Sequence, residues 1–110
     1  MGVTIWHNPR CSKSRQTLAL LKDPDIRLYL VDPPSETELA DALALLGLKP
    51  IGLMRTAEKL FKELGLKKDD DDRVLLAAMV ENPILIERPI VFANGKAALG
   101  RPPDAVLEIL

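Results

Sequence analysis

The sequence has few of the residue types that cross-link a fold or bind a metal: its 110 residues include one cysteine and one histidine. One cysteine cannot form an internal disulfide, so the fold must be stable without one, which is typical of a reducing cytosol. One cysteine and one histidine are also too few for a zinc site within one chain. We expect no metal and no bound cofactor.

Long apolar runs and a strong net charge are lacking as well. No apolar segment approaches the roughly 20 residues needed to span a bilayer, and the N-terminus does not have the pattern of a signal peptide. The net charge is -1 at pH 7, which indicates neither a nucleic-acid nor a membrane partner. The length, with 47% hydrophobic and 28% charged residues, fits one soluble globular domain. We expect a cytoplasmic monomer.

The N-terminal third predicts a strand, a helix and a second strand. Residues 3–7 are rich in β-branched and aromatic types, which favours a strand. A helix of about three turns is expected from Cys11 onward, ending near residues 22–25, and a second strand is expected over residues 26–31. This order predicts a βαβ unit with a parallel pair of strands.

Residues 35–82 are expected to form a helical insertion. Ser35 and Glu38 have the spacing of a capping box, Gly47 is a natural helix end, and Pro50 can begin a short second helix. Two further helices are predicted after it. The last of them is expected to bury Val74, Leu75, Ala78 and Met79.

The C-terminal segment returns to strands. Residues 89–99 predict a β-hairpin, because Asn94-Gly95 is the strongest short-range signal for a type I′ turn. Residues 104–110 predict a short terminal helix. The order β-α-β, helices, β-β-α is that of an α/β, thioredoxin-like fold with a helical insertion between the N-terminal βαβ unit and the C-terminal ββα unit.

Cys11 stands where the first strand gives way to a helix, in the stretch HNPRCSKSR. The free N–H groups at a helix start stabilise a thiolate relative to the thiol, and the thiolate is the nucleophile. His7, Arg10 and Arg15 can add positive charge, and Ser14 offers a hydroxyl. The alternative is a buried apolar cysteine, which is common for a free thiol. Its polar and charged neighbours favour the reactive interpretation.

Two known cysteine patterns are absent. A phosphatase-like loop needs an arginine six positions after the cysteine, where Thr17 stands. A dithiol oxidoreductase needs a second cysteine where Ser14 stands. A disulfide formed during turnover must therefore involve an outside thiol.

Three arginines stand at the edges of predicted elements: Arg55, Arg88 before Pro89, and Arg101 before Pro102. Guanidinium groups that converge near a thiolate would bind a tetrahedral oxyanion through bidentate hydrogen bonds.

Taken together, the chain resembles the glutaredoxin-coupled arsenate reductases of the ArsC family, and among them the shorter, YfgD-like members. The matching segments cover nearly the whole chain in the same order: IWHNPRCSKSRQTL, LMR, ELGL, NPILIERPIV and GRPPDAVLEIL. The resemblance implies a thioredoxin-like fold with a helical insertion, and a role in detoxification and arsenic resistance.

The resemblance also implies the roles of individual residues. The family's nucleophile corresponds to Cys11, and the residues that assist it correspond to His7 and Ser14. The arginines that bind arsenate correspond to Arg55, Arg88, Arg101 and, matching as well, Arg15. By analogy with thioredoxin-like folds, the peptide bond before Pro89 is expected to be cis.

The implied cycle begins with attack of the Cys11 thiolate on arsenate. Glutathione, as co-substrate, then adds to the adduct and reduces it to As(III), and glutaredoxin resolves the mixed species. One alternative is a monothiol, glutaredoxin-like thiol–disulfide oxidoreductase, which shares the Cys-x-x-Ser pattern. A second is an Spx-like regulator that binds RNA polymerase, but Ser14 replaces the second cysteine of the redox switch in those proteins.

Overall fold

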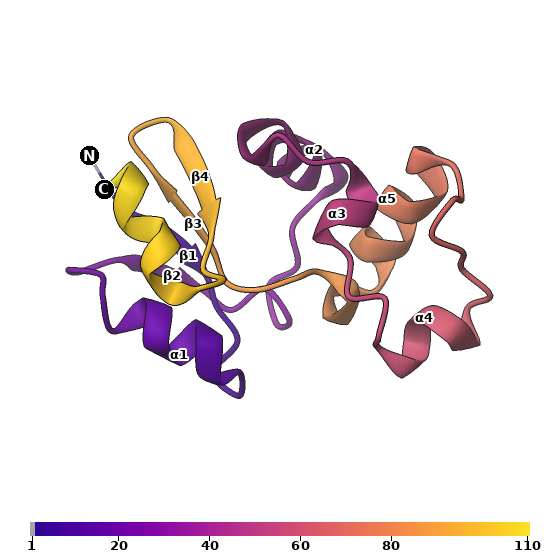
Figure 1. The fold of residues 1–110 in the computed structure, drawn as a ribbon, viewed down its shortest axis with the longest axis horizontal. Coiled ribbons are helices and arrows are strands. Elements are labelled where there is room, and N and C mark those ends of the chain that lie inside the picture. Colours follow the sequence, from indigo (N-terminus) through magenta and orange to yellow (C-terminus); the bar gives the residue numbers. More distant parts are fainter. Residues whose placement is uncertain (1) are drawn as a thin grey trace. The chain divides into compact units, whose positions relative to one another are not determined.

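A computed structural model describes residues 2–110 of the chain. The chain divides into two compact units (Figure 1). The first unit comprises the chain up to Asp32 together with Arg88–Leu110, and the second comprises Pro33–Glu87. The prediction of one domain with a helical insertion over about residues 35–82 stays a prediction.

The first unit is a four-stranded mixed sheet with helices. Its elements are β1 (Thr4–Trp6), α1 (Ser12–Leu18), β2 (Asp25–Arg27), β3 (Ile90–Ala93), β4 (Lys96–Leu99) and the 3-10 helix η2 (Pro103–Ile109). The strand order is β2-β1-β3-β4. Strands β1 and β2 are parallel, whereas β1 and β3, and β3 and β4, are antiparallel. The predicted βαβ unit, the hairpin and the thioredoxin-like α/β fold are therefore confirmed.

The turn of the hairpin has the backbone that its sequence predicts. Asn94 and Gly95 connect β3 to β4 with φ angles of 55° and 72°. A type I′ turn requires a positive φ at both central residues, and asparagine and glycine adopt it most readily. This turn brings the residues that follow β4 back beside those that precede β3.

The second strand is shorter than predicted. It ends at Arg27, and the N–H groups of Val31 and Asp32 both donate to the carbonyl of Leu28 in a turn. The reason lies in its partner, because β1 ends at Trp6, opposite Arg27. Beyond that pair no neighbouring strand remains to continue the ladder, so the prediction of a strand over 26–31 was wrong beyond its first two residues.

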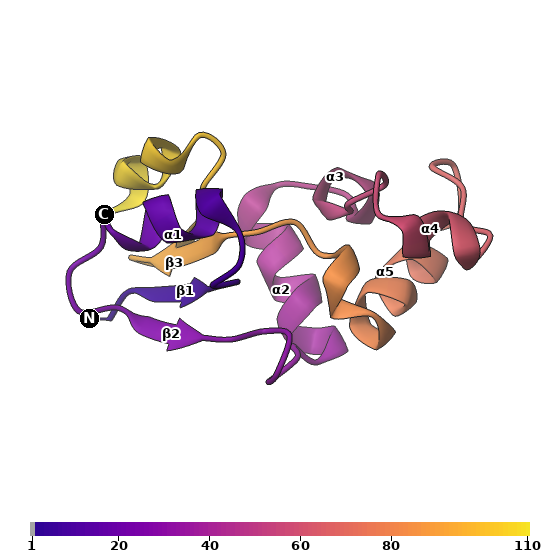
Figure 2. The same ribbon diagram turned by 90° about the horizontal axis from the view of Figure 1, so that it is seen from below.

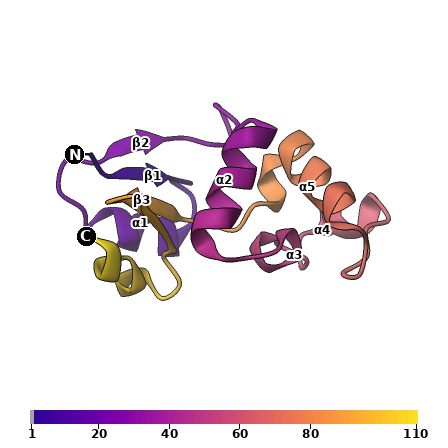
Figure 3. The ribbon, with the colours of Figure 1, turned by 90° about the horizontal axis from the view of Figure 1, so that it is seen from above.

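Helices α1 and η2 pack on the same face of the sheet. Ile5 of β1, Val91 of β3 and Val106 of η2 form a fully buried cluster, and Leu18 and Leu21 from α1 and the turn after it pack against it. In Figure 2 α1 lies in front of the strands, and in Figure 3, from the opposite side, it lies behind them. Helix α1 is thus held against the face of the sheet that carries Ile5 and Val91.

The second unit consists of helices. They are α2 (Glu36–Leu46), α3 (Pro50–Leu53), α4 (Lys59–Glu63), α5 (Asp72–Glu81) and the 3-10 helix η1 (Pro83–Leu85). The predicted capping box is present, with Ser35 accepting from the Glu38 N–H at 3.1 Å, and Gly47 ends α2 with φ 68°. One packing prediction was wrong: Val74 is 48% exposed, because α5 turns Leu75, Ala78 and Met79 inward instead.

Within residues 2–110, no helix combines the length and the apolar composition that crossing a membrane requires.

Candidate active site

Cys11 is the residue immediately before α1, in extended conformation with φ -95° and ψ 123°. The segment before it forms a tight turn, in which the Cys11 N–H donates to the Asn8 carbonyl at 3.0 Å. The Asn8 side chain accepts from the Arg10 N–H at 3.0 Å, and Arg15 Nη1 donates to the Pro9 carbonyl at 2.9 Å. Hydrogen bonds local to this stretch therefore fix the path by which the chain leaves β1 and presents Cys11.

Buried hydrogen bonds of Ser14 with His7 and Asn8 stabilise this turn. Ser14 is fully buried, and His7 and Asn8 are each 5% exposed. The Ser14 hydroxyl accepts from the Asn8 N–H at 3.0 Å and shares a hydrogen bond of 2.7 Å with His7 Nδ1. The two residues that the resemblance assigns as helpers of the cysteine thus contact each other.

The pKa of His7 lies below its ordinary value of 6.5. Burial of the ring is the main cause, and the positive charge of Arg15 adds to it. Both disfavour the imidazolium, so the ring is neutral at pH 7. His7 therefore acts on its neighbours through hydrogen bonds and not through a positive charge.

The environment of Cys11 favours its thiolate. Partial burial by itself raises the pKa of the thiol, but the N–H of Ser14, the hydrogen bond and charge of Arg88, and the N–H of Lys13 outweigh it. The net pKa of Cys11 lies below the ordinary thiol value. A cysteine with such a pKa is more nucleophilic at neutral pH than a free thiol, because more of it is ionised.

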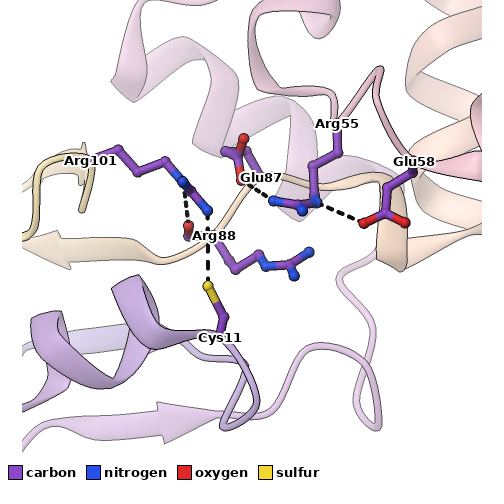
Figure 4. A network of polar contacts seen from close by, with 6 residues as sticks. All are labelled: Cys11, Arg55, Glu58, Glu87, Arg88 and Arg101. Carbon is purple, nitrogen blue, oxygen red and sulfur yellow. Dashed lines mark hydrogen bonds and ion pairs between the residues drawn. The ribbon is translucent and has the colours of Figure 1, made fainter.

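Two arginines far away in the sequence meet at Cys11 (Figure 4). Arg88 stands just before β3, and Arg101 stands two residues after the end of β4. Arg101 Nη2 lies 3.9 Å from Cys11 Sγ, and Arg101 Nε donates to the Arg88 carbonyl at 3.0 Å. The peptide bonds before Pro89 and Pro102 are both cis; the first is the one that the resemblance leads us to expect. The hairpin therefore delivers both guanidinium groups to the thiol.

Arg55 belongs to the second unit and is paired there with two carboxylates. Its Nε donates to Glu58 at 3.0 Å and its Nη1 donates to Glu87 at 2.6 Å, as the dashed lines in Figure 4 show. Burial would lower the pKa of Arg55, but these carboxylates raise it. Its backbone N–H also donates to the Leu85 carbonyl at 2.8 Å, which ties this segment to the chain before Glu87.

Sequence reasoning missed several members of these networks. Asn8 had a signal, because Asn-Pro directly after a strand is a turn pattern in which the asparagine side chain bonds to nearby backbone. No sequence pattern pointed to Glu58 or Glu87 as partners of Arg55, since a glutamate is ordinarily exposed to solvent. In the part of the chain that the structure describes, no group of three or more acidic, histidine or cysteine side chains could hold a metal ion.

A thioredoxin-like sheet with a cysteine of lowered pKa before its first helix, and arginines at its hairpin, defines a thioredoxin-like protein with a thiol site. The ArsC family model matches residues 6–109. The chain therefore belongs to the ArsC family.

Several relatives match it over nearly their full length. The Escherichia coli K12 protein named "Uncharacterized protein YfgD" is 53% identical over 98% of this chain and 96% of its own. An arsenate reductase from Neisseria meningitidis serogroup A is 47% identical over 98% of this chain and 97% of its own. The solved structure of an arsenate reductase from Vibrio cholerae, 52% identical, covers 100% of this chain and 98% of its own with a TM-score of 0.95.

Proposed function

We propose that this protein is an arsenate reductase that takes its electrons from glutathione and glutaredoxin. The observation that supports this most directly is the Cys11 thiol, whose pKa is lowered and whose sulfur lies 3.9 Å from the Arg101 guanidinium. A nucleophile beside fixed positive charge suits attack on a tetrahedral oxyanion. Relatives named arsenate reductase over the full chain support arsenate as that oxyanion.

In the first step the Cys11 thiolate attacks the arsenic of arsenate. A sulfur–arsenic bond forms, an arsenic–oxygen bond breaks, and the departing oxygen takes up protons and leaves as water. Arg88 and Arg101 are proposed to hold the remaining oxygens, because fixed guanidinium groups stabilise negative charge without having to reorganise. Arg15 is proposed to help hold the substrate, while its side chain keeps the turn before Cys11 in place.

External thiols complete the reduction. Glutathione adds to the arsenic of the adduct, and a second water leaves. Two electrons then pass to arsenic as the glutathione sulfur joins the glutaredoxin sulfur in a disulfide, which turns As(V) into As(III). Hydrolysis of the remaining sulfur–arsenic bond releases arsenite and the Cys11 thiol. Ser14 stands where a resolving cysteine would be, so an outside thiol is needed for turnover.

His7 and Ser14 are proposed to support the nucleophile by holding the turn and the first N–H groups of α1 around it. The proposal for Arg55 rests on the resemblance to the family alone. Its guanidinium donates to Glu58 and Glu87, so binding an oxyanion would require it to exchange one carboxylate for the substrate. We place the protein in the cytoplasm as a monomer, where glutathione keeps its single thiol reduced.

The test is arsenate turnover with glutathione and glutaredoxin, followed by arsenite release. Cys11→Ser should abolish it, and Arg88→Ala should weaken it strongly, because Arg88 stabilises the thiolate. Arg73→Ala is a matched control, since Arg73 is an exposed arginine on α5 of the second unit. It should leave turnover unchanged.

Omission of one component at a time identifies the electron donor. Loss of turnover without glutaredoxin supports the full cycle, whereas undiminished turnover with glutathione alone contradicts the role of glutaredoxin. A wild-type protein that is folded and does not reduce arsenate refutes the proposed reaction. Reduction of a small mixed disulfide by that same protein would instead support the monothiol oxidoreductase.

A further inference from the structure

Gly100 lies directly after β4, in a space too small for any side chain. A Cβ atom on Gly100 would lie 2.6 Å from Pro89 Cγ and 3.1 Å from Thr17 Cγ2, and closer still to the Thr17 hydroxyl oxygen. Ordinary contacts of a Cβ atom begin at 3.4 Å. Gly100 does not have a positive φ, unlike Gly95. The glycine is therefore required by this close approach and not by its backbone conformation.

Neither neighbour of Gly100 can move aside easily. Thr17 is fully buried on α1, its hydroxyl donates to the Lys13 carbonyl at 2.8 Å, and a β-branched side chain has few rotamers in a helix. Pro89 is buried, and its ring is joined to its own backbone. The Pro89 carbonyl also accepts from the Gly100 N–H at 2.9 Å. Gly100 is thus packed between α1 and the chain that enters β3.

This contact adjoins both arginines of the thiol site. Arg101 follows Gly100, and Arg88 precedes Pro89. The two arginines are joined by the hydrogen bond from Arg101 Nε to the Arg88 carbonyl, and Arg101 Nη2 lies 3.9 Å from Cys11 Sγ. The other side of the contact is α1, which begins next to Cys11. A change in spacing at Gly100 would therefore alter the separation between the guanidinium groups and the sulfur.

We propose that Gly100 is a positioning residue for Cys11: its lack of a side chain lets the segments that carry Arg88 and Arg101 rest directly on α1, within reach of the sulfur. The inference rests on the reactive role proposed for Cys11, but not on arsenate as the substrate. Hydrogen bonds to sulfur weaken steeply as they lengthen, and charge interactions weaken with distance. A methyl group at this position should therefore make the thiolate less stable.

The test is the pH dependence of Cys11 alkylation by iodoacetamide in the full chain. Gly100→Ala should raise the pKa of Cys11 by about 0.5, which makes alkylation about threefold slower at pH values below the pKa. Gly95→Ala is a matched control in the same unit. It has no atom within 4 Å of the added Cβ but a φ of 72°, so it should destabilise the hairpin and leave the pKa of Cys11 unchanged.

A double variant separates positioning from folding. Thr17→Ala added to Gly100→Ala removes the two Thr17 contacts and leaves the one with Pro89. The pKa of Cys11 in the double variant should then lie between its values in the wild type and in Gly100→Ala. If Gly100→Ala does not fold, the double variant is compared with the wild type in its place.

An unchanged pKa in the folded variant, or an equal rise in Gly95→Ala, overturns the proposal. An ordinary thiol pKa in the wild type overturns the proposed reactivity of Cys11, and this inference with it. A lowered wild-type pKa that Gly100→Ala does not move overturns the inference alone.

Discussion

Replacing Ser14 by alanine should destabilise the first unit by about 2–4 kcal/mol. The hydroxyl of Ser14 accepts from the Asn8 N–H at 3.0 Å and shares a 2.7 Å hydrogen bond with His7 Nδ1. Loss of one such bond costs about 1 kcal/mol, and a buried N–H left without a partner costs roughly 1–3 kcal/mol. Water cannot readily replace the hydroxyl, because Asn8 and His7 are each 5% exposed.

Urea denaturation followed by tryptophan fluorescence measures this loss. Trp6 is the only tryptophan of the chain, and it lies in β1 of the same unit, with its ring centroid 4.9 Å from the ring centroid of Phe92. Ser12→Ala is the matched control, since Ser12 is an exposed serine on α1 and its replacement should cost at most about 0.5 kcal/mol. A loss in Ser14→Ala no larger than in Ser12→Ala would refute the reasoning.

The same variant separates stability from reactivity. Ser14→Ala keeps the backbone N–H that helps lower the pKa of Cys11. The alkylation rate of Cys11 as a function of pH should therefore still give a pKa below the ordinary thiol value, even though the unit unfolds at a lower urea concentration.

Replacing His7, Arg101 or Glu87 should change either the stability of the fold or the pKa of Cys11. Burial and a nearby arginine lower the pKa of His7, so below pH 6.5 the unfolded chain binds a proton that the folded chain does not. Urea stability should fall from pH 7 to pH 5, and less so in His7→Gln. Arg101→Gln should raise the pKa of Cys11 in alkylation assays, because it removes a positive charge whose Nη2 lies 3.9 Å from the sulfur. Glu87→Gln should lower the free energy of unfolding of the second unit by about 1–2 kcal/mol, because it breaks the ion pair with Arg55. Thermal unfolding followed by circular dichroism measures this loss.

Each of these outcomes has its own check. Equal pH dependence in His7→Gln and the wild type contradicts the neutral buried ring. Arg73→Gln, a change of an exposed arginine in the second unit, should not move the pKa of Cys11; an equal rise there means that net charge alone is responsible. Glu81→Gln, at an exposed glutamate on α5, should cost less than Glu87→Gln, and an equal loss contradicts the value given to the ion pair.

Elements whose conformation is set by neighbouring residues were predictable. The capping box of Ser35 and Glu38 and the Asn94-Gly95 turn are present as predicted, because both depend on hydrogen bonds and φ angles within four residues. The strand expected over 26–31 was too long, since its length is set by β1, which ends opposite Arg27. Val74 was assigned to the buried face of its helix by spacing alone, and spacing cannot tell which side of a helix meets the rest of the unit.

The sequence by itself determined the local frame of the thiol site. The strand, the Asn8-Pro9 turn and the helix that follows Cys11 lie in one stretch, so the hydrogen bonds that hold Cys11, His7 and Ser14 together join residues at most seven positions apart.

Only the tertiary structure decided which arginines meet that thiol. Arg101 lies 90 positions from Cys11, and it reaches the sulfur because the hairpin folds back at Asn94-Gly95 and Gly100 packs without a side chain against α1. The pairing of Arg55 with Glu87, 32 positions away, was likewise invisible in the sequence. Contacts of this range depend on sheet register and on the packing of elements, and no local pattern of residues encodes either.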